Sequence, residues 1–253
     1  MGNSGFDLTG RIVIVTGGSR GLGRAMSMAF AHAGASVVVA SRKADACSAV
    51  ATEITDLGGT AIGAATHLGR AEAIEALVST TVERFGGIDV VVNNAANPLG
   101  GMLADTTAEA FHAAYDTNVL GPLRLCQASL PHLSSSEHAS VINVITVGAF
   151  NPGVSLGLYC SAKAALWNLT RTMAKEWGPL GIRVNAIAPG PFDTDMMAPT
   201  LNIPEFRQQI VNAAVQHRIA EPEELVGAAL LLASDAGSYM TGSCITVDGG
   251  TMA

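Results

Sequence analysis

The chain has 253 residues, of which 49% are hydrophobic and 14% charged, a composition typical of a compact globular protein and not of a disordered one. A formal net charge of −7 without any Lys/Arg run excludes nucleic acid and anionic membranes as expected partners. The cysteines lie far apart without a CxxC pair, so we expect no disulfide framework, no metal site and a cytoplasmic location. The longest apolar run, Val226–Ala233, is too short for a membrane span.

Short apolar, β-branched runs recur along the chain and predict strands at 12–15, 37–40, 60–64, 90–92, 141–145, 184–187 and 245–247. Segments with helical spacing lie between them at 22–33, 43–57, 70–85, 107–132, 156–177 and 222–234. The strand runs are apolar on both faces, as in a parallel sheet covered by helices on both sides. We therefore expect an α/β, doubly wound fold with a seven-stranded parallel sheet.

No linker, fixed-period repeat or long low-complexity tract divides the chain, so we predict a single domain over residues 1–253. The stretch from about 189 to 218 breaks the alternation, with prolines at 189, 191, 199 and 204. This stretch is interpreted as a substrate lid or an irregular insertion.

A glycine-rich segment, TGGSRGLG, joins the first predicted strand to the first predicted helix. Glycines there allow a sharp turn and let a pyrophosphate approach the helix N-terminus, where free N–H groups favour anions. Glycines also serve ordinary turns, but this position between strand and helix favours dinucleotide binding. The candidate cofactor residues of the loop are Gly17, Ser19, Arg20, Gly21, Leu22 and Gly23.

The end of the second strand reads ASRK, where an NAD-binding protein would place a carboxylate on the ribose 2′-hydroxyl. Arg42 can instead pair with a 2′-phosphate, with Ser41 donating a hydrogen bond and Arg20 approaching from the glycine loop. We therefore predict NADP(H) in preference to NAD(H). The alternative is that Arg42 and Lys43 only flank a solvated helix start.

The sequence YCSAK places Tyr159 and Lys163 four residues apart in a predicted helix, on one face. A Lys ammonium about 5 Å from the phenol, at an effective dielectric near 20, would stabilise tyrosinate by roughly 3 kcal/mol, or two pKa units. The spacing therefore predicts a Tyr159 pKa close to the working pH. Such a pair alone is more often a surface or packing feature, so the other motifs decide.

The motifs TGGSRGLG, NNAA, Asn118 in TNVLG, YCSAK and PGPFDT occur in this order. Together they resemble the short-chain dehydrogenase/reductase (SDR) family, and the resemblance runs from Leu8 to the closing VDGG, Val247–Gly250. It implies a Rossmann-type fold and an oxidoreductase that interconverts a carbonyl and a secondary alcohol with a nicotinamide cofactor.

The resemblance assigns Tyr159 as general acid or base, Lys163 as the residue that holds the nicotinamide ribose and lowers the Tyr pKa, and Asn118 as the residue that positions a relay water. Asn118 can equally be a helix-kink or capping residue. Asn93 would lie beside the adenosine half of the cofactor. The further cofactor residues that it implies are Leu68, Ala95, Pro189, Gly190, Phe192 and Thr194.

Two positions depart from the family pattern. The catalytic Ser is replaced by Thr146, thirteen residues before Tyr159. Thr keeps the hydroxyl but adds a methyl that stiffens the side chain; Ser140 and Ser155 are weaker candidates. His67 and Leu68 stand where relatives carry an Asp and an apolar residue beside the adenine, so the adenine contacts are expected to differ.

The loops after the strands are apolar, with Pro98, Leu99, Phe150, Pro152, Phe192, Met196 and Met197 as candidate substrate contacts. They favour a neutral or moderately apolar carbonyl or alcohol, such as a 3-oxoacyl, steroid or sugar-type ketone. The resemblance also implies a homotetramer or homodimer formed through the helices at 107–132 and 156–177. The competing hypothesis is a nucleotide-sensing or scaffold protein that kept the fold and lost turnover.

Overall fold

The computed structural model describes residues 5–253 and contains the predicted sheet. All strand pairs are parallel, and the order is β3-β2-β1-β4-β5-β6-β7. The strands are β1 Ile12–Thr16, β2 Ser36–Ser41, β3 Thr60–Ala65, β4 Val90–Asn93, β5 Ser140–Val144, β6 Arg183–Pro189 and β7 Cys244–Val247. The predicted fold class is confirmed, and each strand lies within a residue or two of its expected bounds.

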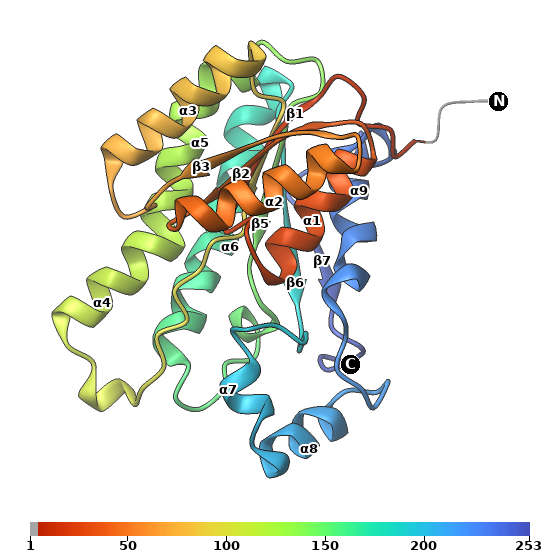
Figure 1. Ribbon diagram of the computed structural model, residues 1–253. Helices are drawn as coiled ribbons and strands as arrows, with labels where there is room; N and C mark the ends of the chain where they lie inside the picture. The colour runs from red at the N-terminus through yellow and green to blue at the C-terminus, as the bar shows by residue number, and fades with distance from the viewer. Residues whose placement is uncertain (1–4) are drawn as a thin grey trace.

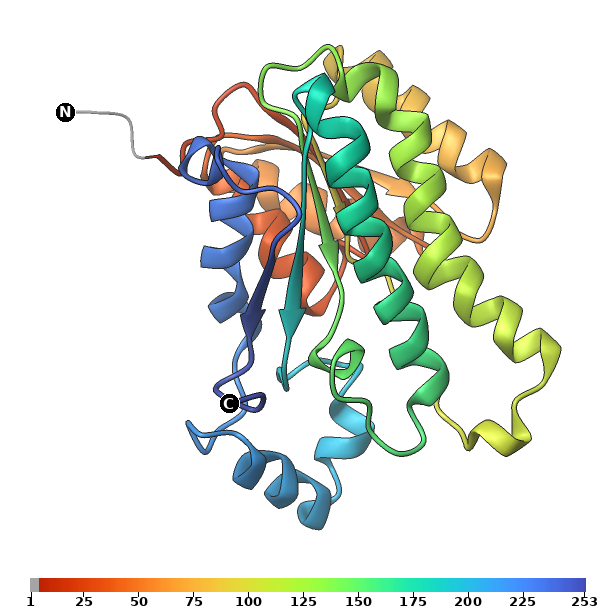
Figure 2. The same ribbon diagram turned by 180° about the vertical axis from the view of Figure 1, so that it is seen from behind.

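Helices cover both faces of the sheet (Figures 1 and 2). The α-helices flanking it are α1 Gly21–His32, α2 Ala44–Asp56, α3 Ala71–Phe85, α4 Ala108–Tyr115, α5 Gly121–Leu133, α6 Gly157–Trp177 and α9 Val226–Ala233. One apolar core lies between the sheet and α1, α2 and α9, and a second between the sheet and α3, α5 and α6. Strands β1, β4 and β5 are almost wholly buried, whereas β3, at the edge, alternates between half-buried and exposed. The expectation of strands apolar and covered on both faces is therefore wrong for β3.

The helix predicted over 107–132 is interrupted. Between α4 and α5 the residues Asp116–Leu120 form a π-helical segment. Asn118 lies in it and donates from Nδ2 to the carbonyl of Ala114, 2.8 Å away. A π segment inside a helix is uncommon and is often found at functional sites. The helix predicted over 222–234 also divides, into a 3₁₀ turn at Pro222–Leu225 and α9.

The segment after β6 is less irregular than its prolines indicate. It contains α7, Ala198–Leu201, and α8, Pro204–Ala213. Proline stands in the first turn of both helices, where its missing N–H costs no hydrogen bond. Both helices lie beyond the carboxyl ends of the strands, which point downward in Figure 1.

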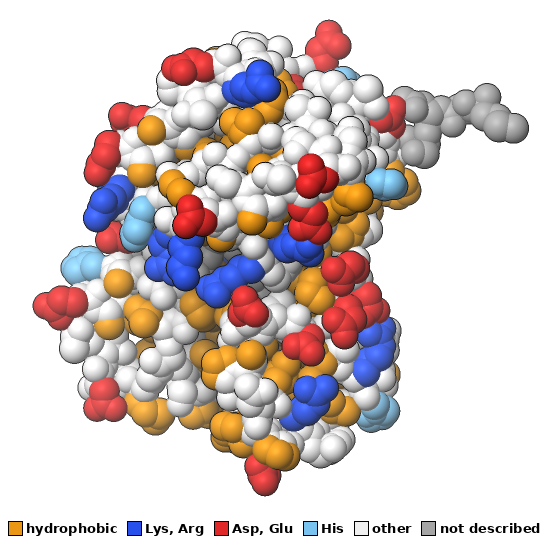
Figure 3. Space-filling view, in the orientation of Figure 1, with side chains coloured by type: hydrophobic (Ala, Val, Ile, Leu, Met, Phe, Trp, Pro, Cys, Tyr) orange, Lys and Arg blue, Asp and Glu red, His pale blue; other side chains and the backbone are white. Residues whose placement is uncertain are grey.

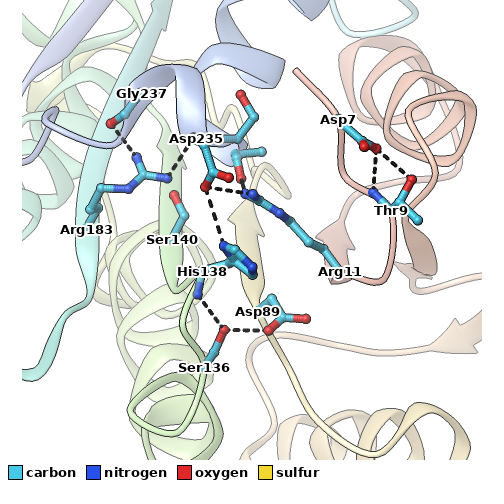
Figure 4. Close-up of polar contacts among 12 residues, drawn as sticks. Asp7, Thr9, Arg11, Asp89, Ser136, His138, Ser140, Arg183, Asp235 and Gly237 are labelled. Carbon is cyan, nitrogen blue, oxygen red and sulfur yellow. Dashed lines mark hydrogen bonds and ion pairs between the residues drawn. The ribbon is translucent and has the colours of Figure 1, made fainter. Parts of the chain in front are cut away.

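A polar network closes the opposite end of the sheet (Figure 4). Arg11, just before β1, is 4% exposed; it donates to the carbonyl of Ala233 and pairs with Asp235 at 2.7 Å. His138 lies 3.4 Å from the same carboxylate, and Arg183 donates to the carbonyl of Gly237. These contacts tie the amino ends of the strands to the turn before β7. The chemistry-bearing motifs all lie at the other end.

Candidate functional site

The glycine loop connects β1 to α1 at the carboxyl end of the sheet. Gly17 and Gly21 have φ values of +63° and +50°, in the left-handed region that favours glycine. A Cβ on Gly23 would lie 2.1 Å from the carbonyl oxygen of Gly17, so the loop packs against the helix as only glycine allows. No side chain caps α1 at Arg20, which leaves the first-turn N–H groups for phosphate oxygens. This cradle fits the pyrophosphate of a nicotinamide dinucleotide.

A hydrogen-bonded pair joins the glycine loop to the end of β2. Ser19 donates from Oγ to Ser41 Oγ across 2.9 Å. Arg42 follows on the surface, and no ion pair found within residues 5–253 holds its guanidinium. The structure therefore joins Ser19 to Ser41, and the predicted 2′-phosphate site of Ser41, Arg42 and Arg20 stays a prediction. Arg20 differs, because it forms an exposed ion pair with Asp195 at 3.6 Å.

The NNAA motif follows β4 and holds the glycine loop in place. Asn94 donates from Nδ2 to the carbonyls of Thr16 and Gly17, at 2.9 and 3.2 Å. The backbone N–H groups of Asn94 and Ala95 donate to Thr16 Oγ1. Sequence reasoning assigned no role to Asn94 or Thr16. The signal was present, since both residues belong to the quoted motifs.

Asn93 points into the core rather than outward. Its side chain is buried, and Nδ2 donates to Asn143 Oδ1 at 2.8 Å and to Cys126 Sγ at 3.3 Å. Asn143 in turn donates to Thr170 Oγ1 on α6, also at 2.8 Å. The Asn93 side chain thus links β4, β5 and two helices beneath the site. A contact with adenosine would have to come from its backbone.

Asn118 is buried in the π segment and clamps the loop after β4. Its Nδ2 donates to the Asn97 carbonyl at 2.9 Å, and its Oδ1 accepts from the Asn97 N–H at 3.1 Å. With the bond to Ala114, both Nδ2 protons are used within the chain. Asn118 thus lies in a distorted stretch of helix, and its role with a relay water remains a prediction.

Thr146 lies where β5 ends and a short 3₁₀ turn begins. Its Oγ1 accepts a hydrogen bond from the Gly148 N–H at 3.2 Å, which leaves the hydroxyl proton for another acceptor. A Cβ on Gly148 would lie 2.7 Å from Cys160 Sγ and 3.5 Å from Thr146 Cγ2. The turn that carries Thr146 therefore packs against the first turn of α6, beside Tyr159.

Ser140 and Ser155, the other two candidate hydroxyls, do not lie on the turn after β5 that carries Thr146. Ser140 is buried at the amino end of β5 and donates to the Leu232 carbonyl at 2.8 Å, so it cannot reach the site. Ser155 lies on the exposed loop before α6, where its Oγ contacts Met102 Sδ. Thr146 is the candidate that this geometry retains.

Tyr159 and Lys163 lie one turn apart on α6. Lys163 is 1% exposed; its Nζ lies 5.9 Å from the centre of the Tyr159 ring and donates to the Val144 carbonyl at 2.7 Å. A buried Lys is rare unless it is paired or functional. The bond to Val144 holds Lys163 Nζ at the end of β5, two residues before Thr146 in the chain, and over the Tyr159 ring.

The electrostatics of this pair correct the sequence prediction. Burial raises the pKa of Tyr159, and a smaller contribution from Cys160 acts in the same direction. Burial also lowers the pKa of Lys163 to about 7. The predicted lowering of the Tyr159 pKa is therefore wrong for this arrangement, because desolvation disfavours the charged form of the phenol. At neutral pH the phenol holds its proton.

The start of the segment after β6 borders the glycine loop. Pro189 ends β6, and Gly190 donates to the Val247 carbonyl at 2.9 Å. Thr194 comes close to Gly21, since a Cβ there would lie 3.3 Å from Thr194 Cγ2. Phe192, in contrast, is 3% exposed and belongs to the apolar core that contains α9. Its side chain is therefore a packing residue in this structure and does not offer the expected contact to a substrate.

Leu68 is also a core residue. Its side chain is buried in the core beneath α3 and α5, and a Cβ on Gly121 would lie 2.8 Å from Leu68 Cβ. His67 next to it is exposed and accepts a hydrogen bond from the Gly69 N–H. The departure from the family pattern at this turn is therefore accommodated by packing. An adenine contact from Leu68 stays a prediction.

The described residues offer neither a metal-binding cluster nor a membrane-spanning helix. Within residues 5–253, no cluster of His, Cys, Asp and Glu side chains could hold a metal ion. Over the same residues, no helix combines the length and the apolar character that crossing a membrane requires.

Comparison with known proteins supports the motif assignment. The family model described as "Enoyl-(Acyl carrier protein) reductase" matches residues 17–252. Dehydrogenase/reductase SDR family member 4 of Pongo abelii is 36% identical over 245 residues, covering 96% of this chain and 88% of that protein.

Two solved structures are similar over nearly the whole chain. A 7α-hydroxysteroid dehydrogenase complexed with NADH and 7-oxo glycochenodeoxycholic acid has a TM-score of 0.95 and 34% identity, covering 99% of this chain and 98% of the other. A 3-oxoacyl (acyl-carrier-protein) reductase from Agrobacterium tumefaciens C58, with NADP bound, has a TM-score of 0.91 and 32% identity, covering 97% and 95%. The chain belongs to the short-chain dehydrogenase/reductase family of NAD(P)-dependent oxidoreductases, which interconvert carbonyls and alcohols.

Proposed function

We propose that the protein is an NADP(H)-dependent reductase or dehydrogenase acting on a neutral, moderately apolar ketone or secondary alcohol. The observation that carries the catalytic part is the burial of Lys163 one turn from Tyr159, with its Nζ held at the end of β5 by the Val144 carbonyl. A buried ammonium without a carboxylate partner costs stability. A role in cofactor binding and catalysis would explain why a lysine occupies this buried position.

The residues act on the proton and on the substrate oxygen. When bound, the nicotinamide cofactor supplies or accepts the hydride. Tyr159 carries its proton at neutral pH, as an ordinary phenol does, and burial raises its pKa further. In reduction it donates that proton to the carbonyl oxygen as negative charge develops. Thr146 donates a hydrogen bond to the same oxygen from the hydroxyl that already accepts from Gly148. Lys163 holds the cofactor ribose.

The preference for NADP(H) rests on the end of β2. Ser41 and the exposed Arg42 present a hydroxyl and a guanidinium where a carboxylate would favour NAD(H). Figure 3 shows Lys and Arg side chains gathered near the middle of one face, above the α7–α8 segment. Among the similar structures one holds NADP and another NADH, so this chain's own residues carry the proposal.

The substrate class rests on the apolar rim below the site. Figure 3 shows hydrophobic side chains over the α7–α8 segment, and Phe150, Leu156, Met196, Ile203 and Phe206 are exposed. The loop after β4 meets the loop before α6, where Gly101 donates to the Ser155 carbonyl at 2.8 Å. A ketone with an apolar body fits this rim better than a phosphorylated one. The segment 189–218 would act as its lid.

The test is a spectrophotometric assay of NADPH consumption with ketones, aldehydes and acyl thioesters, repeated with NADH. We expect turnover on an apolar ketone, and a lower dissociation constant for NADPH than for NADH. Equal affinity for the two cofactors would refute the preference. Cofactor binding without turnover on any compound would favour the nucleotide-sensing or scaffold hypothesis instead.

We also infer a homo-oligomer formed through α4, α5 and α6. Phe111 on α4 and Leu120, the last residue of the π segment before α5, are exposed, and Phe111 stacks on Tyr115 with ring centres 4.3 Å apart. Large apolar side chains exposed together are typical of an interface. Light scattering of the purified protein should give a dimer or tetramer mass, and a monomer at assay concentration would contradict this inference.

A further inference from the structure

A buried thiol lies behind the predicted 2′-phosphate site. Cys47, in the first turns of α2, is 0% exposed, and its Sγ lies 3.0 Å from Ser41 Oγ. The Cys47 thiol also donates to two backbone carbonyls, those of Ser41 and Ala64, each 3.6 Å from the sulfur and so farther than Ser41 Oγ. Ser41 also accepts the bond from Ser19. The three side chains thus form one hydrogen-bonded row from the glycine loop into the interior.

The thiol is held in this place by the neighbouring strand. A Cβ on Gly63 of β3 would lie 2.7 Å from the Cys47 carbonyl carbon and 3.0 Å from Cys47 Cβ. Because β3 has a glycine at this position, the start of α2 can lie directly against the sheet. Gly63 thus sets how closely the Cys47 backbone and Cβ approach β3.

The direction of the proton between Cys47 and Ser41 decides what Ser41 can offer. A thiol is both a weak donor and a weak acceptor. If Ser41 donates to Sγ, its only proton is used inward. If Cys47 donates to Ser41 Oγ, Ser41 accepts from both Ser19 and Cys47, and its own proton points outward. A 2′-phosphate has acceptor oxygens only, so it requires this second arrangement.

We propose that Cys47 is a positioning residue for cofactor specificity, which acts through Ser41 by turning the Ser41 hydroxyl into a donor toward an anionic 2′-group. The proposal rests on the proposed NADP(H) preference. It concerns the row Ser19–Ser41–Cys47 and leaves the chemistry at Tyr159 unaffected. Removing the thiol should therefore weaken NADPH binding and leave NADH binding nearly unchanged.

The experiment measures dissociation constants of NADPH and NADH by calorimetry for the whole protein, so it needs no turnover. For Cys47→Val and Cys47→Ala we expect NADPH to bind about three- to tenfold more weakly, the size of one modest hydrogen bond. Cys47→Ser keeps a donor and should restore binding. Cys244→Ala, a cysteine in β7 far along the sheet from β2, is the matched control and should leave both constants unchanged.

A double-mutant cycle tests whether Cys47 acts through its neighbour. In a Ser41→Ala background, Cys47→Val should have no further effect on NADPH binding. Equal weakening of both cofactors would show a merely structural role and overturn the proposal, as would wild-type binding by Cys47→Val. If Cys47→Val does not fold, Cys47→Ala and the Ser41 background give the same comparison. If the wild-type protein binds NADPH and NADH equally, the proposed cofactor preference is refuted. The proposal for Cys47 is tested separately, by whether its substitution changes the ratio of the NADPH and NADH dissociation constants.

Discussion

Lys163 Nζ lies 5.9 Å from the centre of the Tyr159 ring and donates its hydrogen bond to the Val144 carbonyl. The pair is thus anchored to the end of β5, where Thr146 follows two residues later. The ammonium is buried without a carboxylate partner among residues 5–253. This arrangement places an amine next to the phenol that we propose as proton donor, and burying the amine lowers the unfolding free energy of the protein.

That cost predicts a pH-dependent effect of Lys163→Met. Burial lowers the pKa of Lys163 from 10.5 to about 7. Between these two values the unfolded chain binds more protons at Lys163 than the folded chain, so the contribution of Lys163 to the unfolding free energy rises with pH. Below pH 7 the amine is protonated in both states, and the full cost of burying its charge is present. Lys163→Met lacks the penalty. The variant's gain in unfolding free energy should be about 1–3 kcal/mol larger near pH 6 than near pH 9.

Urea unfolding of both proteins at the two pH values measures this difference. The Lys163→Met variant should also lose turnover. A stability difference that does not change with pH would contradict the burial of a titrating ammonium at this position.

The hydroxyl of Thr146 should be required, and its methyl should not. Thr146→Ser keeps the oxygen that accepts from Gly148, so we expect activity within a few-fold of wild type. Thr146→Val has nearly the same shape without the hydroxyl, and kcat should fall by about 100-fold or more. Steady-state kinetics of the two variants check this. Similar activity of both would rule out a catalytic hydroxyl.

Arg42 should discriminate between the cofactors. It is exposed at the end of β2 beside Ser41, so its removal should cost little stability. A charge-assisted bond to the 2′-phosphate predicts that Arg42→Ala weakens NADPH binding by about 10- to 100-fold and leaves NADH binding almost unchanged. Lys43→Ala is the neighbouring control. If both variants weaken NADPH by the same factor, general surface charge and not Arg42 accounts for the preference.

Gly23 should not tolerate a side chain. A Cβ there would meet the Gly17 carbonyl oxygen, which is backbone and cannot move aside. Gly23→Ala should therefore lower the unfolding free energy by about 1–3 kcal/mol and weaken cofactor binding. Gly227→Ala is a matched control in α9, where no atom lies within 4 Å of the added Cβ. It should be neutral or stabilising by about 0.5–1 kcal/mol; equal losses in both variants would count against the packed loop.

Much of the fold could be predicted because the local patterns agree with it. The apolar run 90–92 becomes the buried central strand β4, and the four-residue spacing of Tyr159 and Lys163 places them one turn apart on α6. The glycine loop was equally clear from its position between β1 and α1. These features depend on residues close in sequence.

The features that escaped prediction depend on contacts distant in sequence. The π segment needs Asn118 to reach Asn97, and no local pattern shows that bond. Phe192 occurs in a site motif, yet its side chain is buried in the core. The predicted pKa of Tyr159 is wrong because a Coulomb argument for the pair leaves out the removal of water from around the Tyr159 phenol and the Lys163 amine. Burial could be known only from the packed structure.

The central claim is that Tyr159 supplies the proton in a hydride-transfer reaction. The most direct measurement is the rate of NADPH consumption by the wild type and by Tyr159→Phe with the best ketone of the panel. Because phenylalanine keeps the ring beside Lys163 and removes only the hydroxyl, we expect kcat to fall by about 100- to 10,000-fold with stability and NADPH binding nearly unchanged. Turnover by Tyr159→Phe at the wild-type rate, or none by a wild type that binds NADPH, would contradict the claim.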